Sequence, residues 1–185
     1  HGADVALCVD VAATHFYDRG SYVPGVERIA SDQMIDRLVS WQRQYGLVSV
    51  EDGLAEDDWE HWPRLAERLK GRALVVGDDL LCTNPERIRR AMTSRAADAL
   101  LLKVNQIGTV SEAVESLRLA RSGGWSVTVS ARSGDTEDDW LADLAVGWRA
   151  DQIKVGSITQ SERLAKYNRL LAIEADTGWQ VVDWP

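Results

Sequence analysis

Short apolar runs alternate with amphipathic helical patterns along nearly the whole chain. Each run is long enough for a strand that is buried on both faces, as in a parallel sheet. A helical pattern follows each run after a short connection, and this alternation predicts a parallel sheet with helices outside it. The six predicted strands are Val5–Val9, Leu47–Val50, Ala73–Gly77, Leu100–Leu102, Trp125–Val129 and Ala150–Ile153.

Helix start signals stand between these runs. Asn84 before Pro85 is a cap followed by proline at the first helical position, and Thr109 with Glu112 has the capping-box pattern. The stretch from Thr14 to Gly25 is polar and turn-like. The other predicted helices run from Ser31 to Gly46, from about Trp59 to Leu69, from a cap at Gly134–Glu137 onward, and from Gln160 to about Ala175.

A polar residue ends every predicted strand. Parallel strands point the same way, so these residues are expected on one face, and in a closed barrel they ring a single cavity. One such residue alone only marks the end of a strand, but six in succession, five of them charged, indicate a functional site. The residues are Asp10, Glu51, Asp78, Lys103, Ser130 and Lys154.

Composition excludes several classes of partner. A net charge of −8 over 185 residues argues against nucleic acid, because a phosphate backbone requires a basic surface. No apolar run reaches the length that crosses a bilayer, and no signal-peptide pattern is present. Cys8 and Cys82 lack CxxC spacing, which favours a reducing compartment. We therefore expect a cytoplasmic globular protein.

Three of the strand-end residues are carboxylates: Asp10, Glu51 and Asp78. An oxygen-only cluster suits a hard cation, most often Mg²⁺, which keeps positions for water and substrate oxygens. Without a cation, three neighbouring carboxylates repel one another. A single one of them is better explained as a cap of the following loop, but three with equal placement predict a magnesium site.

Two lysines, Lys103 and Lys154, end the fourth and sixth strands. A nearby divalent cation and a second ammonium disfavour the charged form of a lysine, so that it can act as a base. The metal stabilises the enolate that forms when a proton leaves a carbon next to a carboxylate. The ring therefore predicts proton abstraction α to a carboxylate; the rival hypothesis is an anion site in which both lysines only hold charge.

The fifth strand end continues into Ser130–Gly134, which contains Arg132 and Ser133. A guanidinium, hydroxyls and a flexible turn before a helix suit a phosphate or phosphonate group. The same residues also fit an ordinary polar loop.

Five stretches closely resemble the enolase family, the phosphopyruvate hydratases. The resemblance implies Mg²⁺ held by Asp10, Glu51 and Asp78, and Lys103 as the base that removes the α proton. It also implies that Lys154 contacts the substrate carboxylate and that Arg132 and Ser133 contact its phosphate. The stretches are VEDGLAEDDWEHW, VGDDLLCTNPERI, AADALLLKVNQIGTVSEAVES, SARSGDTEDDWLADLAVG and QIKVGSITQSERLAKYNRLLAIE.

The resemblance implies an α/β fold, a TIM-type (β/α) barrel of which residues 1–185 supply about the last six strand–helix units. The family's smaller amino-terminal α+β domain and first barrel strands have no counterpart in this sequence, nor do its glutamate pair and closing loop. The family also implies a small-molecule substrate and a homodimer or larger homo-oligomer.

Four positions depart from the family: Ala131 replaces His, Gly53 replaces Pro, His15 replaces Glu and Gln160 replaces Arg. Loss of the imidazole at Ala131 removes a hydrogen-bonding group and opens space beside the reacting carbon or the substrate's phosphorus group. We therefore keep three hypotheses: a lyase acting on 2-phosphoglycerate, a paralogue such as carboxyphosphonoenolpyruvate synthase of phosphonate biosynthesis, and a non-catalytic enolase-like binding protein. The complete carboxylate and lysine set argues against the third.

Overall fold

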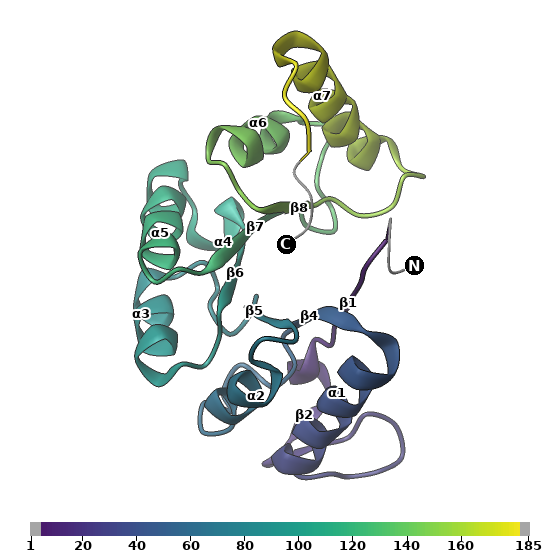
Figure 1. The fold of residues 1–185 in the computed structure, drawn as a ribbon, viewed down its shortest axis with the longest axis vertical. Coiled ribbons are helices and arrows are strands. Elements are labelled where there is room, and N and C mark those ends of the chain that lie inside the picture. Colours follow the sequence, from purple (N-terminus) through teal and green to yellow (C-terminus); the bar gives the residue numbers. More distant parts are fainter. Residues whose placement is uncertain (1–4, 182–185) are drawn as a thin grey trace. The chain divides into compact units, whose positions relative to one another are not determined.

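The computed structural model describes residues 5–181, and the chain divides into two compact units, His1–Ser126 and Val127–Pro185 (Figure 1). The larger unit contains four parallel strands among its described residues: β1 (Leu7–Asp10), β4 (Leu47–Glu51), β5 (Leu74–Gly77) and β6 (Ala99–Leu102). They pair in the order β1-β4-β5-β6, and each is followed by helical structure. The predicted parallel α/β organisation of this part of the chain is confirmed.

The stretch after β1 contains more structure than the turn that the sequence predicts. A short 3₁₀ helix, η1 (Ala13–Phe16), leads into the antiparallel pair β2 (Tyr17–Asp18) and β3 (Ser21–Tyr22). Strands of two residues are too short to produce a readable alternation of apolar and polar positions. The pair buries Tyr22 completely.

The longer helices of the larger unit, α1, α2, α3 and α5, bury one face each, as their periodicity requires. Between β4 and β5, α2 buries Trp62, Leu65 and Leu69. Every residue of β6 is buried, as expected for a central parallel strand. The helices are α1 (Ser31–Tyr45), α2 (Trp62–Leu69), α3 (Pro85–Ser94), α4 (Val104–Ile107) and α5 (Val110–Ser122).

The predicted caps of two helices are confirmed. The Asn84 side chain accepts hydrogen bonds from Glu86 N and Arg87 N, and the Thr109 hydroxyl accepts one from Glu112 N. The Thr109 hydroxyl in turn donates to the Glu112 carboxylate, so the two side chains of the capping box are hydrogen-bonded to each other. Two details differ from the prediction: α2 begins at Trp62 rather than Trp59, and the single-turn helix α4 stands between β6 and α5.

Gly53, directly after the end of β4, lies in a tightly packed place. A Cβ atom at this residue meets Leu38 Cδ1 and Leu65 Cδ2 at 2.9 Å. Both leucines are fully buried. The absence of a side chain at Gly53 therefore allows α1 and α2 to pack closely against the end of β4.

The smaller unit contains the parallel pair β7 (Ser126–Ser130) and β8 (Gln152–Lys154), with helices α6 (Trp140–Gly147) and α7 (Ser161–Thr177). Figure 1 shows α6 and α7 packed against each other. The predicted cap at Gly134–Glu137 is wrong, because α6 begins only at Trp140. Instead the Thr136 hydroxyl accepts a hydrogen bond from Asp138 N and donates to the Asp138 carboxylate, closing a local turn.

Arg169 of α7 forms a two-pronged ion pair with Asp143 of α6, with N–O distances down to 2.5 Å. The hydrogen bonds from this guanidinium lower the pKa of the Asp143 carboxyl. The pair is largely exposed, so it fixes the contact between the two helices more than it stabilises the fold.

Candidate active site

The larger unit brings four predicted site residues to one edge of its sheet. Asp10 and Glu51 are register partners at the ends of β1 and β4. Asp78 follows the last residue of β5, and Lys103 follows the last residue of β6. Glu51 and Asp78 are buried, whereas Asp10 is exposed. The parallel register therefore produces the expected row of three carboxylates and one ammonium group.

Asp78 contacts the side chains of Lys103 and Gln106. Its Oδ2 atom forms an ion pair with Lys103 Nζ, and its Oδ1 atom accepts a hydrogen bond of 2.8 Å from Gln106 Nε2. Only 12% of each side chain of the ion pair is exposed. A pair so shielded from solvent is screened little by salt, so the carboxylate holds the Lys103 ammonium firmly in place.

A buried threonine fixes the start of the loop that carries Lys103. The Thr83 hydroxyl accepts a hydrogen bond from Lys103 N at 2.9 Å and donates one to Gln106 Oε1 at 2.7 Å. The hydroxyl of Ser116 donates to the Thr83 carbonyl. These bonds connect the loops after β5 and β6, so Lys103 and Asp78 are held by one continuous polar network.

Asp52 holds the backbone at the same edge of the sheet by hydrogen bonds. Its two carboxylate oxygens accept the backbone N–H groups of Asp78 and Asp79, at 2.9 and 2.7 Å. Burial raises the pKa of the Asp52 carboxyl to about 7, although these two N–H donors act in the opposite direction. The negative charges of Asp78 and Asp79 raise it further. Three acidic groups in this small space are therefore short of positive charge.

The acidic loop between β4 and α2 is held by a buried polar network around Asp58. Its Oδ2 atom accepts hydrogen bonds of 2.7 Å from both the Tyr22 and the Ser31 hydroxyls. The Tyr22 hydroxyl also accepts the N–H of Ala55 at 2.9 Å, and His61 Nδ1 lies 2.6 Å from Asp58 Oδ1. The loop that continues from Glu51 is therefore attached to the β2–β3 pair and to α1.

We expect Tyr22→Phe to lower the free energy of unfolding by about 1–3 kcal/mol, because it leaves the buried Ala55 N–H without its acceptor. Urea denaturation measures this loss. Tyr45→Phe, at a residue that is 48% exposed, is the matched control. Equal effects of the two substitutions would contradict a structural role for the Tyr22 hydroxyl.

Among residues 5–181, one group of acidic side chains is close enough to hold a metal ion: Asp52, Asp78 and Asp79, whose carboxylate oxygens lie within 4.8 Å of one another. These three carboxylates face a single ammonium group in the described part of the chain, that of Lys103, and an all-oxygen donor set with such an excess of negative charge fits a hard divalent cation. Of the predicted ligands only Asp78 belongs to this group, so the set Asp10, Glu51 and Asp78 stays a prediction. The two additional aspartates, Asp52 and Asp79, have a signal in the sequence. Each is the second member of an acidic pair at the end of a strand: Glu51–Asp52 at β4 and Asp78–Asp79 at β5.

The smaller unit carries the other predicted site residues. Ser130 and Lys154 are register partners at the ends of β7 and β8, and Ala131 N donates to the Lys154 carbonyl at 2.9 Å. Arg132 and Ser133 follow in an exposed turn. The methyl group of Ala131 packs against the apolar cluster of Val129, Leu141 and Ala145 rather than offering a polar group.

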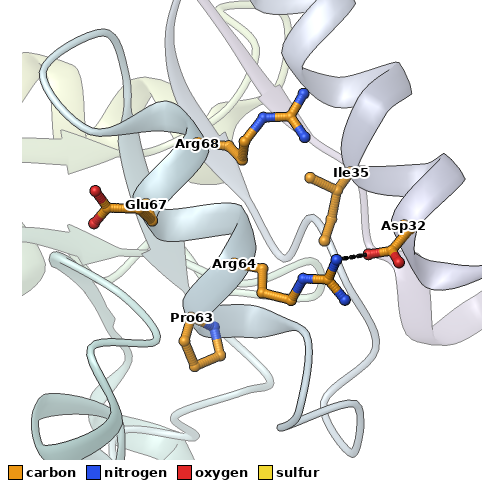
Figure 2. Close-up of a pocket in the computed structure, with 6 residues that line it drawn as sticks. All are labelled: Asp32, Ile35, Pro63, Arg64, Glu67 and Arg68. Carbon is orange, nitrogen blue, oxygen red and sulfur yellow. Dashed lines mark ion pairs between the residues drawn. The ribbon is translucent and has the colours of Figure 1, made fainter.

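The larger unit has two other features, a surface groove and an exposed histidine, that are not among the contacts described above. A surface groove between α1 and α2, shown in Figure 2, is lined by Asp32, Ile35, Pro63, Arg64, Glu67 and Arg68. Arg64 forms an ion pair of 2.8 Å with Asp32 in the groove, and Arg68 forms one of 2.9 Å with Asp36. His15 is exposed on η1. No helix within residues 5–181 combines the length and the apolar character needed to cross a membrane.

Fold and site together define an α/β protein of the barrel type, with acidic and basic side chains at the carboxyl ends of parallel strands. The chain matches the family model described as enolase, C-terminal TIM barrel domain, over residues 1–182. The protein therefore belongs to the enolase family, and the fold expected from the sequence, part of a (β/α) barrel, is confirmed.

Proposed function

We propose that this protein is a Mg²⁺-dependent lyase that removes the proton α to a carboxylate from 2-phosphoglycerate or a close analogue. The observation that carries the proposal is the shielded ion pair of Lys103 with Asp78 beside two further carboxylates. Membership of the enolase family supports an enzyme of that superfamily. Substrate and reaction type are our inference from the chemistry of these residues.

In the proposed reaction, Asp78 would bind Mg²⁺ instead of the Lys103 ammonium, and removal of this ion-pair partner favours the unprotonated amine. That amine takes the proton from the carbon next to the substrate carboxylate. The electron pair of the broken C–H bond moves into the carboxylate, and its return forms the C=C bond and expels the β-hydroxyl as hydroxide. The hydroxide takes up a proton from solvent and becomes water. Lys154 contacts the substrate carboxylate, and Arg132 with Ser133 contacts the phosphate. A guanidinium is well suited to this last task because it binds phosphate oxygens in a two-pronged fashion.

Magnesium, when bound, supplies positive charge that stabilises the enolate. Asp78, together with Asp10 and Glu51, is the ligand set that we propose, and the aspartates at 52 and 79 lie close enough to Asp78 to contribute. The all-carboxylate chemistry of this edge supports a hard cation over zinc or copper, which favour nitrogen and sulfur ligands.

Ala131 favours a second candidate in the same reaction class. A residue that packs into an apolar cluster supplies no hydrogen bond to the substrate, and it occupies less room than the histidine usual in the family. The alternative is therefore an enolase paralogue whose substrate has a larger phosphorus group, such as the carboxyphosphono substrate of carboxyphosphonoenolpyruvate synthase. We propose a small-molecule substrate and a homo-oligomer for either candidate.

The experiment compares two substrates with the same purified protein. Enolpyruvate formation is followed by ultraviolet absorbance with 2-phosphoglycerate and with its carboxyphosphono analogue, each with Mg²⁺ and after removal of Mg²⁺ by EDTA. We expect Mg²⁺-dependent product from at least one of them, and the higher kcat/KM identifies the substrate. Absence of turnover and of α-proton exchange with both substrates contradicts the proposal and favours a non-catalytic binding protein.

A further inference from the structure

A lysine is the one residue of α7 that is fully buried. Lys166 is 1% exposed, whereas the apolar residues of the same helix are half-buried or exposed. Burying an ammonium group is costly unless hydrogen bonds and opposite charge compensate for the lost water. A buried lysine at a position where a helix normally buries an apolar residue therefore indicates a specific role for the polar contacts of its ammonium group.

The ammonium group of Lys166 contacts two residues of the loop between β7 and α6. Its Nζ atom donates a hydrogen bond of 2.6 Å to the Thr136 carbonyl and lies 3.7 Å from the Asp135 carboxylate. Asp135 and Thr136 follow Arg132 and Ser133 in sequence after one intervening residue, Gly134. The buried ammonium is thus attached to the carboxyl-terminal end of the segment that carries the proposed phosphate-binding residues.

That segment is a tight turn. Asp135 N donates to the Arg132 carbonyl at 3.2 Å, and Gly134 has a φ of 83°, a conformation that glycine adopts without strain. At the other end, the hydrogen bond from Ala131 N to the Lys154 carbonyl attaches the turn to β8. The Arg132–Asp135 turn is therefore fixed at its start by the sheet and at its end by Lys166.

Neighbouring residues of α7 contact a different loop. Arg163 Nη1 donates to the Val155 carbonyl at 3.0 Å, and the Tyr167 hydroxyl donates to the Gly156 carbonyl at 2.7 Å. These bonds hold the segment that follows Lys154. Because the two sets of contacts act on separate loops, the effect of Lys166 can be tested against Tyr167 on the same helix.

We propose that Lys166 is a positioning residue, which holds the Arg132–Asp135 turn in the shape that presents Arg132 and Ser133 to the phosphate or phosphonate group of the substrate. Its role is indirect, because its contacts are with the loop and not with substrate. The inference rests on the proposed function for the identity of the bound group. The ordering of the turn by Lys166 stands on the contacts alone.

The test compares Lys166→Met, which keeps the aliphatic stem but loses the ammonium, with Tyr167→Phe. Hydrogen exchange of the Asp135 amide, measured by NMR, reports on the turn without any substrate. We expect exchange to be about tenfold faster in Lys166→Met and unchanged in Tyr167→Phe. Amides of β4 and β5 in the same samples, together with urea midpoints, separate a local change from general loss of stability.

Steady-state kinetics provide the second measurement. In Lys166→Met we expect KM for 2-phosphoglycerate or its carboxyphosphono analogue to rise about tenfold, with a much smaller change in kcat, because binding of the phosphorus group is lost rather than proton abstraction. Asp135→Asn, which removes only the ionic contact, is expected to move KM in the same direction by less. This variant keeps the test decisive if Lys166→Met does not fold.

Unchanged exchange at Asp135 in Lys166→Met overturns the proposal. Faster exchange with an unchanged KM also overturns it, since the turn then has no part in binding phosphate. A protein that neither binds nor turns over either substrate disproves the proposed function, and the role in substrate binding falls with it. The exchange result still decides whether Lys166 orders the turn.

Discussion

Replacing Lys103 with methionine is expected to lower kcat by about 10³-fold or more, because general-base catalysis contributes 10²–10⁴-fold and Lys103 is the amine that lies against Asp78. Methionine keeps much of the length of the lysine stem but cannot accept a proton. The sharper measurement is exchange of the substrate's α hydrogen in deuterated water, since it reports on proton abstraction even when elimination is slow. We expect this exchange to disappear together with turnover.

Lys70→Met is the matched control, because this lysine follows α2 on an exposed surface. Its substitution is expected to leave exchange and turnover unchanged. If Lys103→Met retained α-hydrogen exchange within about tenfold of the unmodified protein, Lys103 would not be the base. The proposed mechanism would then have to assign the proton to another group.

Replacing Trp62 with alanine is expected to lower the free energy of unfolding by about 3–5 kcal/mol, the range for a large aromatic side chain removed from a core. Trp62 is fully buried, and its Nε1 atom donates a hydrogen bond of 2.9 Å to the Ala55 carbonyl. The loss therefore includes a cavity and a contact to the acidic loop after Glu51. Urea denaturation followed by circular dichroism measures it.

Two further substitutions separate these contributions. Trp62→Phe keeps most of the ring volume but loses the hydrogen bond, so we expect a smaller effect than that of Trp62→Ala. Trp140→Ala removes the same kind of side chain from a position that is 44% exposed, and it should cost much less. Similar losses from Trp62→Ala and Trp140→Ala would show that burial of Trp62 against the acidic loop contributes little.

The order of elements was predictable because each one carries its own local signal. The helix Ser31–Tyr45 ends at Gly46 as expected, since Gly46 adopts a left-handed conformation that terminates a helix. Asn84 and Thr109 are correctly predicted caps because capping depends on residues within one turn. The strand ends followed from short runs of apolar residues, and the strands are parallel as the alternation with helices requires.

What the sequence did not reveal depends on contacts between distant residues. The single turn α4 has no buried face, so no periodicity marks it. The wrong cap at Gly134–Glu137 arose because Thr136 bonds within its own turn instead of starting a helix. In the site, the hydrogen bonds of Thr83 and Asp52 join separate loops, and only the fold brings their partners together.

The row of site residues was predictable for a simpler reason: residues at equivalent ends of parallel strands must lie on the same edge. The register of Asp10 with Glu51 and the ion pair of Lys103 with Asp78 agree with that geometry. Which carboxylates approach one another most closely was not predictable, because it depends on side-chain direction. Asp52 and Asp79 form a group with Asp78 whose carboxylate oxygens lie within 4.8 Å of one another.

The packing around Gly53 has a consequence for protein engineering. A Cβ atom at this residue would lie 2.9 Å from Leu38 Cδ1 and Leu65 Cδ2, and both leucines are fully buried. Replacing Gly53 with proline, the residue that the resemblance to enolases leads us to expect at this position, therefore requires both leucine side chains to shift. A change of activity in such a variant would report on repacking between α1 and α2 as much as on substrate preference.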